Sequence, residues 1–126
     1  LIDNCLSKNS KKTISILNEN NYSSDDCILI LRTMLQKVKR ILKLKKEIEK
    51  SKNIDQAISS FKPLIFWKEK EIVKQQTLNW TTKNAENLVY QINEIEILIK
   101  KNAVNSLNII SDFIINKSNG TNNYSL

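Results

Sequence analysis

The stretch SSDDCILILRTMLQKVKRILKLKKEIEK, residues 23–50, decides the fold of this chain. Its apolar residues recur at alternating steps of three and four, the spacing of one helical face. The first row comprises Ile28, Leu31, Leu35, Val38 and Leu42. A second row beside it comprises Ile30, Met34, Ile41 and Ile48. Because the two rows together are too wide for one partner helix, we predict a central helix that contacts at least two neighbours.

The ends of the predicted helices are marked by polar residues. Ser23 and Asp26 have the spacing of a capping box, so the central helix should run over about residues 24–50. Ser10 is expected to cap the preceding helix, and Asn20 and Asn21 to supply a left-handed position at its end. We expect an opening segment over residues 1–6 and further helices over about residues 11–20, 54–60, 64–76, 82–101 and 103–116.

The composition also favours helices. The 126 residues include one glycine, Gly120, and one proline, Pro63. Sandwiches, barrels and doubly wound sheets need turn residues every ~8–12 positions, which this chain does not have. With short connections and no fixed repeat, the sequence predicts an all-α fold, an irregular bundle of five to six helices. We assign residues 1–116 to this domain and residues 117–126 to a flexible polar tail.

The residue inventory excludes most enzyme classes. The absence of histidine removes Ser-His-Asp and Cys-His triads and His-ligated metal sites, and a single glycine cannot form a phosphate-binding loop. Cys5 and Cys27 follow no metal-binding spacing and are expected to be free thiols in a reducing cytosol. No apolar run reaches the ~20 residues of a membrane span. We therefore expect a cytoplasmic, non-catalytic protein without cofactor or metal. Because the chain opens on Leu1, we also expect a piece of a longer protein.

Positive charge is concentrated in one segment. The chain has a net charge of +7, and residues 32–52 alone, with nine basic and two acidic residues, account for that excess. At ~100° per residue, five basic side chains fall within about 60° of one another: Arg32, Lys39, Lys43, Lys46 and Lys50. This row is either a phosphate-contacting surface of salt-dependent affinity or a solvated helix face. The 19 Ile, 18 Lys and 17 Asn indicate a low-GC genome, which favours lysine without selection for binding.

Several apolar residues exceed what one bundle needs to bury. Trp67 and Trp80 flank the end of one predicted helix and could serve either the core or a partner contact. The predicted helix over residues 103–116 has two apolar sides, and Ile109 and Phe113 lie on the second of them. Candidate interface residues are therefore Phe66, Trp67, Trp80, Ile109 and Phe113.

Three stretches together suggest a family. The first is LIDNCLSKNSKKTISIL at residues 1–17, and the second is ILILRTMLQKVKRILKLK at residues 28–45. The third combines KPLIFWKEK at residues 62–70, LNWTT at residues 78–82 and EILIK at residues 96–100. In this order and spacing, over about residues 1–116, the set resembles the C-terminal domain of the delta subunit of the bacterial DNA polymerase III clamp loader. Asn9 and Asn21 stand where the family usually has turn glycines.

The resemblance implies a non-catalytic role in DNA replication. In that family, the C-terminal helical domains of sibling subunits pack together as a circular collar. In that family the N-terminal part of delta contacts the sliding clamp, and the resemblance implies that this chain is the collar piece without that part. The expected partners are thus other clamp-loader subunits, with DNA as a further partner through the basic row. The alternative function is an autonomous basic bundle that binds nucleic acid non-specifically.

Overall fold

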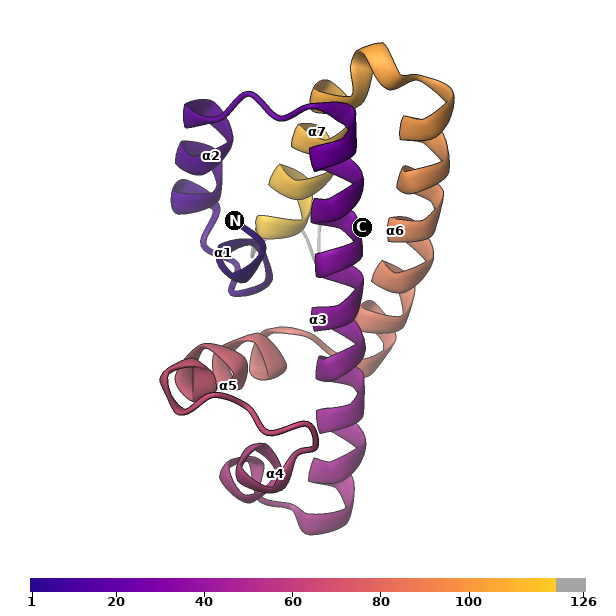
Figure 1. Cartoon of the computed structure of the whole chain (residues 1–126). Helices are drawn as coiled ribbons and strands as arrows, with labels where there is room; N and C mark the ends of the chain where they lie inside the picture. Colours follow the sequence, from indigo (N-terminus) through magenta and orange to yellow (C-terminus); the bar gives the residue numbers. More distant parts are fainter. Residues whose placement is uncertain (120–126) are drawn as a thin grey trace.

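The structure, a computed structural model, describes residues 1–119, and this part of the chain is helical throughout with no strand (Figure 1). The elements are α1 (Ile2–Leu6), α2 (Ser10–Glu19), α3 (Ser24–Ser51), α4 (Ile54–Ser60), η1 (Trp67–Glu69), α5 (Lys70–Asn79), α6 (Thr82–Lys101), η2 (Ala103–Asn105) and α7 (Ser106–Ser118), where η marks a 3₁₀ turn. The predicted all-α bundle is confirmed, with seven α-helices among the described residues instead of five to six. Most of the proposed tail, residues 120–126, lies outside the described residues, whereas Lys117 and Ser118 belong to α7.

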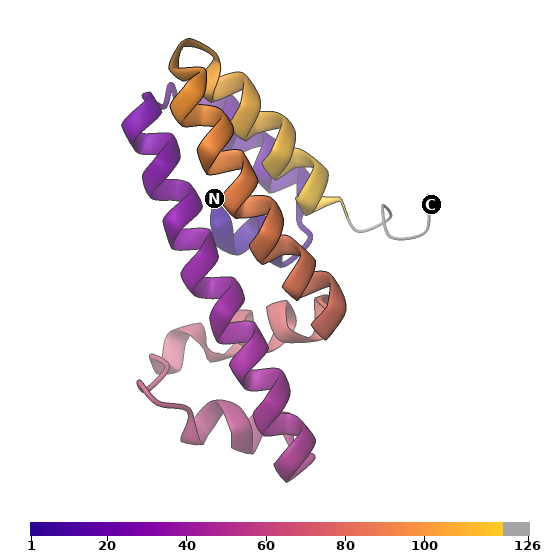
Figure 2. The same ribbon diagram turned by 90° about the vertical axis from the view of Figure 1, so that its right-hand side faces the viewer.

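α3 is the spine of the molecule and begins with the predicted capping box. The Ser23 hydroxyl accepts a hydrogen bond from the Asp26 amide at 3.1 Å, and the Asp26 carboxylate accepts one from the Ser23 amide at 3.0 Å. α3 packs against α1, α4, α5, α6 and α7, which confirms the prediction of several neighbours. Figure 2 shows α6 and α7 beside its N-terminal half, with α4 and α5 at its C-terminal half.

Two apolar clusters lie along this spine. The larger one joins α1, α2, α6 and α7 to the N-terminal half of α3, through buried residues such as Leu6, Leu31, Met34, Ile92 and Ile110. The smaller one joins α4, α5 and their connection to the C-terminal half of α3. Its buried residues are Leu44, Ala57, Ile58, Phe61, Ile65 and Val73. The bundle thus has a main body and a smaller lobe that share one helix.

A polar cluster lies where the two parts meet. The Asp3 carboxylate accepts hydrogen bonds from the Lys37 ammonium at 2.7 Å and from the Gln76 side-chain amide at 2.9 Å. Burial alone would raise the pKa of Asp3, but these hydrogen bonds and the charges of Lys37 and Arg40 outweigh it and lower the pKa. The cluster therefore ties α1, α3 and α5 together through a stabilised carboxylate.

The segment after Pro63 differs from its prediction. We expected a helix over residues 64–76, but the chain stays extended through Phe66, which has φ −57° and ψ 134°. A 3₁₀ turn follows, and α5 then runs on to Asn79, beyond the predicted end of the helix at residue 76. The extended stretch lets Ile65 reach the smaller cluster, where it is buried. The chain is thus extended where its local sequence pattern predicts a helix, and Ile65 packs into the smaller cluster at that point.

The left-handed positions also differ from their prediction. Asn20 is extended, and positive φ occurs instead at Lys8 (63°) and Lys52 (56°). Lys8 lies between α1 and α2 and Lys52 between α3 and α4, whereas the connection from α2 to α3 is extended at Asn20. Asn9, and not Ser10, caps α2, because its side-chain oxygen accepts from the Lys12 amide at 3.1 Å.

Candidate functional site

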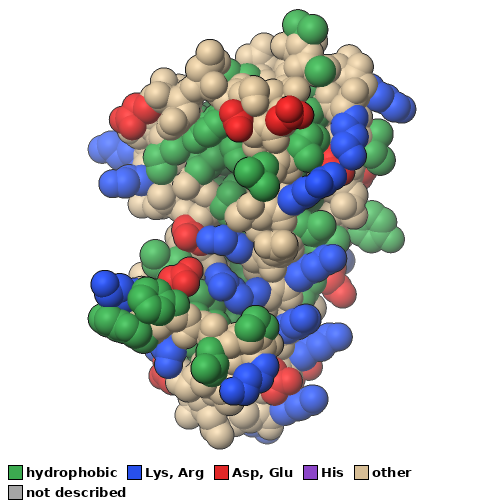
Figure 3. All heavy atoms as spheres, viewed as in Figure 1, with side chains coloured by type: hydrophobic (Ala, Val, Ile, Leu, Met, Phe, Trp, Pro, Cys, Tyr) green, Lys and Arg blue, Asp and Glu red, His purple; other side chains and the backbone are tan. Residues whose placement is uncertain are grey.

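The five residues of the predicted basic row are all exposed on α3. Arg32 is set apart from the others, because its Nε lies 3.5 Å from a carboxylate oxygen of Glu96 on α6. Lys100 contacts the other oxygen of Glu96 at 3.0 Å. The remaining four form no ion pair within residues 1–119, and we call them the basic face: Lys39, Lys43, Lys46 and Lys50. Figure 3 shows Lys and Arg side chains following the C-terminal half of α3.

Two hollows flank the basic face, where α3 meets the segment after α4. The first, which we call the waist hollow, has a volume of about 390 Å³ and is lined mainly by Lys37, Lys39, Arg40, Lys43, Phe61 and Pro63. The second, the lower hollow, has about 610 Å³ and includes Lys46, Glu47, Glu49, Lys50 and Lys62. They share Lys43 and Phe61. Sequence reasoning missed Lys37 and Arg40 as site residues, because it kept only side chains pointing in one helical direction.

An aromatic pair protrudes from the smaller lobe. Phe66 is 53% exposed and Trp67 is 69% exposed, and their ring centres lie 5.9 Å apart. Leu64 beside them is also exposed. Hydrophobic side chains are visible at the surface of this lobe in Figure 3. We call Leu64, Phe66 and Trp67 the aromatic patch.

Trp80 is a core residue, which corrects its inclusion among the candidate interface residues. It is 5% exposed, and its indole Nε1 donates a hydrogen bond to the Leu6 carbonyl oxygen at 2.9 Å. The Lys8 ammonium covers the ring at 3.9 Å from its centre. The indole N–H therefore has its acceptor inside the molecule, and very little of the side chain is accessible to a partner. Of the two alternatives for Trp80, core packing and partner contact, its burial supports core packing.

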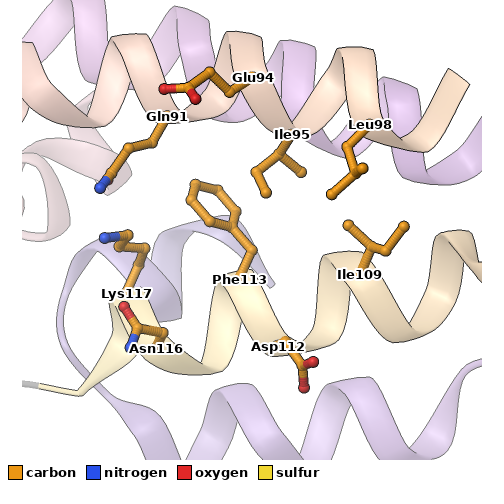
Figure 4. A pocket seen from close by; sticks show the side chains of 9 residues that line it. All are labelled: Gln91, Glu94, Ile95, Leu98, Ile109, Asp112, Phe113, Asn116 and Lys117. Atoms are coloured by element: carbon orange, nitrogen blue, oxygen red, sulfur yellow. The ribbon is translucent and has the colours of Figure 1, made fainter. Parts of the chain in front are cut away.

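A groove runs between α6 and α7 and contains the last two candidate interface residues (Figure 4). Its volume is about 560 Å³. Ile95 and Leu98 of α6 face Ile109 and Phe113 of α7 across it, with Glu94 at the rim. Phe113 is buried and Ile109 is half-buried, so these two form the floor, and the exposed Leu98 forms an apolar edge.

The two thiols lie in the core of the bundle. Cys5 and Cys27 are both free and buried. Desolvation raises the pKa of Cys5 to about 12, and burial together with the Asp26 charge raises that of Cys27, so neither is a thiolate at neutral pH. Within residues 1–119 there is no group of three or more Cys, Asp or Glu side chains placed to hold a metal ion. In the same part of the chain, no helix combines the length and apolarity needed to cross a bilayer.

Comparison of the chain with protein-family models, with curated proteins and with solved structures gave no match. The clamp-loader resemblance therefore rests on the sequence pattern. The physical basis for a function lies in three surfaces of the described residues, which are the basic face, the aromatic patch and the groove between α6 and α7.

Proposed function

We propose that this chain is a non-catalytic assembly module that binds other helical domains. In this proposal it is the C-terminal collar domain of the delta subunit of a bacterial DNA polymerase III clamp loader, acting in the cytoplasm. The observation that carries the proposal is the aromatic patch. Phe66 and Trp67 are largely exposed although the chain buries two apolar clusters elsewhere. Aromatic side chains exposed together are typical anchors of protein interfaces.

The chemistry of the patch fits a protein partner. Lys68, whose Nζ lies 5.4 Å from the Trp67 ring centre, supplies a polar neighbour to an apolar centre. An apolar centre with a polar rim is the usual organisation of a protein interface. The groove between α6 and α7 supplies a second apolar surface on the main body. Two separate surfaces would let one domain contact two neighbours, as a circular arrangement requires.

Co-migration on size exclusion tests this function. The chain is mixed with the other clamp-loader subunits, with full-length delta as the positive control. We expect a complex that Trp67→Ala weakens by about 2 kcal/mol, the cost of losing an interface hot spot. Tyr90→Ala is the matched control, because Tyr90 is an exposed aromatic on α6 outside the patch. Absence of a complex while full-length delta assembles would refute the proposal.

A second candidate function is non-specific nucleic-acid binding, which the basic face favours. Its four lysines are exposed and have no acidic partner within the described residues. Such surfaces bind phosphates with an affinity that falls as salt rises. The triple charge reversal Lys39→Glu, Lys43→Glu and Lys46→Glu should abolish nucleic-acid binding and leave subunit assembly intact. Loss of assembly with retained nucleic-acid binding would contradict this assignment of surfaces.

A further inference from the structure

The waist hollow is a strongly cationic concave site beside α3. Four basic side chains line it, from Lys37, Lys39, Arg40 and Lys43, and no acidic side chain does. The lower hollow, by contrast, includes both Glu47 and Glu49. Concave sites with weakly polarisable walls focus the field of the charges that line them. The waist hollow is therefore suited to hold an anion, whereas Lys46 and Lys50 of the basic face share the lower hollow with two carboxylates.

Arg40 has unused hydrogen-bonding capacity in this hollow. Its guanidinium donates no hydrogen bond and forms no ion pair within residues 1–119, and its Nε is shielded from water without an acceptor. Shielded polar groups in folded proteins nearly always have a partner. A planar guanidinium with five donors matches the oxygens of a phosphate group. An oxyanion bound in the hollow would supply the acceptors that the guanidinium lacks.

The charges of the hollow match a phosphate better than a carboxylate. Lys37 is paired with Asp3 at 2.7 Å, so its charge is already balanced. Lys39, Arg40 and Lys43 remain, and none of them has an ion-pair partner among the described residues. Three cations would overcompensate a carboxylate, whereas a terminal phosphate carries about −1.5 to −2 at neutral pH. The volume of about 390 Å³ also fits a small ligand.

We propose that the waist hollow binds a terminal phosphate or pyrophosphate group, with Arg40 as the main donor and Lys39 and Lys43 as charge partners. The Asp3 carboxylate, held by Lys37 and Gln76, fixes α3 against α1 and α5 at this point. The site goes beyond both proposed functions, because a small phosphate compound would occupy it in the absence of other subunits and of polynucleotide. The phosphate can come from a free compound or from the end of a nucleic acid.

Isothermal titration of the whole chain tests the site with three probes. These are pyrophosphate, a 5′-phosphorylated oligonucleotide and the same oligonucleotide without its phosphate. We expect pyrophosphate to bind, and Arg40→Gln to weaken it at least about tenfold, as expected for a lost charge-assisted hydrogen bond. Since Arg40 is partly buried, the exposed pair Lys39→Gln and Lys43→Gln provides a second test with the same expected loss. The matched control is Lys46→Gln with Lys50→Gln, which removes equal charge from the same helix outside the hollow and should change affinity less than about twofold.

The three probes separate the sources of the phosphate. Preference for the 5′-phosphorylated oligonucleotide, lost in the Lys39 and Lys43 pair, supports the site with a nucleic-acid end as ligand. Pyrophosphate binding without that preference supports the site with a free phosphate compound as ligand. Equal loss in both lysine pairs overturns the discrete site and leaves a diffuse basic surface. If the unaltered chain neither binds pyrophosphate nor prefers the 5′-phosphorylated oligonucleotide, the site is also overturned, and the assembly proposal is left untouched.

Discussion

The indole N–H of Trp80 is hydrogen-bonded to the carbonyl oxygen of Leu6 at 2.9 Å, although the two residues are 74 positions apart. Trp80 directly follows α5, and Leu6 is the last residue of α1. The bond therefore satisfies a buried main-chain carbonyl at a helix end that lacks its own intrahelical donor. It fixes the point where the smaller lobe returns to the main body.

Trp80→Phe should destabilise the chain by about 1–3 kcal/mol, because the Leu6 carbonyl would stay buried without its donor and the smaller ring would leave a void. Urea unfolding measures the change. Trp67→Phe is the matched control, and it should alter the free energy of unfolding by less than about 0.5 kcal/mol because Trp67 is mostly exposed. Equal effects of the two substitutions would contradict the structural role of Trp80.

Asp3 should make stability depend on pH in the acid range. Its pKa is lower in the folded chain than its ordinary value of 3.8, so its contribution is complete above about pH 4. That contribution is lost as the pH falls through the folded-state pKa. Asp3→Asn should cost about 1 kcal/mol at neutral pH, at the low end for charged hydrogen bonds because the carboxylate is partly exposed.

The free energy of unfolding of Asp3→Asn and of the unaltered chain, measured at several pH values from about 2 to 7, checks this expectation. This range brackets the titration of carboxyl groups. The difference between Asp3→Asn and the unaltered chain should shrink below pH 4. The exposed Asp112 provides a control through Asp112→Asn. A difference that stays constant down to pH 2 would show that the Asp3 carboxylate contributes nothing through its charge.

The sequence was most informative where local signals decide the structure. The capping box at Ser23 and Asp26 predicted the start of α3, and α6 covers the predicted residues 82–101. These features depend on residues three or four positions apart, which sequence alone displays. The predicted helix over residues 54–60 likewise matches α4, which Asn53 caps locally by accepting from the Gln56 amide at 3.1 Å.

Features that depend on distant contacts were predicted less well. The extended stretch around Ile65 packs against α3, some twenty positions earlier in the chain, so no local pattern indicates it. Trp80 could not be assigned to core or surface until its bond to Leu6 was seen. The role of Arg40 could not be predicted from the sequence either, because the hollow beside it is completed by Phe61 and Pro63, which lie far along the chain.

Leu44→Ala should destabilise the smaller lobe selectively. Leu44 is fully buried, and its truncation should cost about 2–5 kcal/mol through a cavity in the smaller cluster. Because the two clusters share only α3 among the long helices, amide hydrogen exchange should rise more in α4 and α5 than in α2 and α7. Leu31→Ala, in the larger cluster, is the matched control and should show the opposite distribution. An equal rise throughout either variant would indicate one cooperative unit.

The salt dependence of nucleic-acid binding should separate the basic face from Arg32. Each phosphate contact removed should reduce the slope of log affinity against log salt by about 0.9 on duplex DNA. Lys43→Gln and Lys46→Gln remove unpaired charges and should each reduce the slope by about that amount. Arg32→Gln should change it little, because Arg32 is already paired with Glu96 at 3.5 Å. Fluorescence anisotropy with labelled duplex at several salt concentrations measures the slopes. If Arg32→Gln lowers the slope as much as the lysine variants, the ion pair with Glu96 does not keep Arg32 from the phosphates, and the basic face extends along the whole of α3.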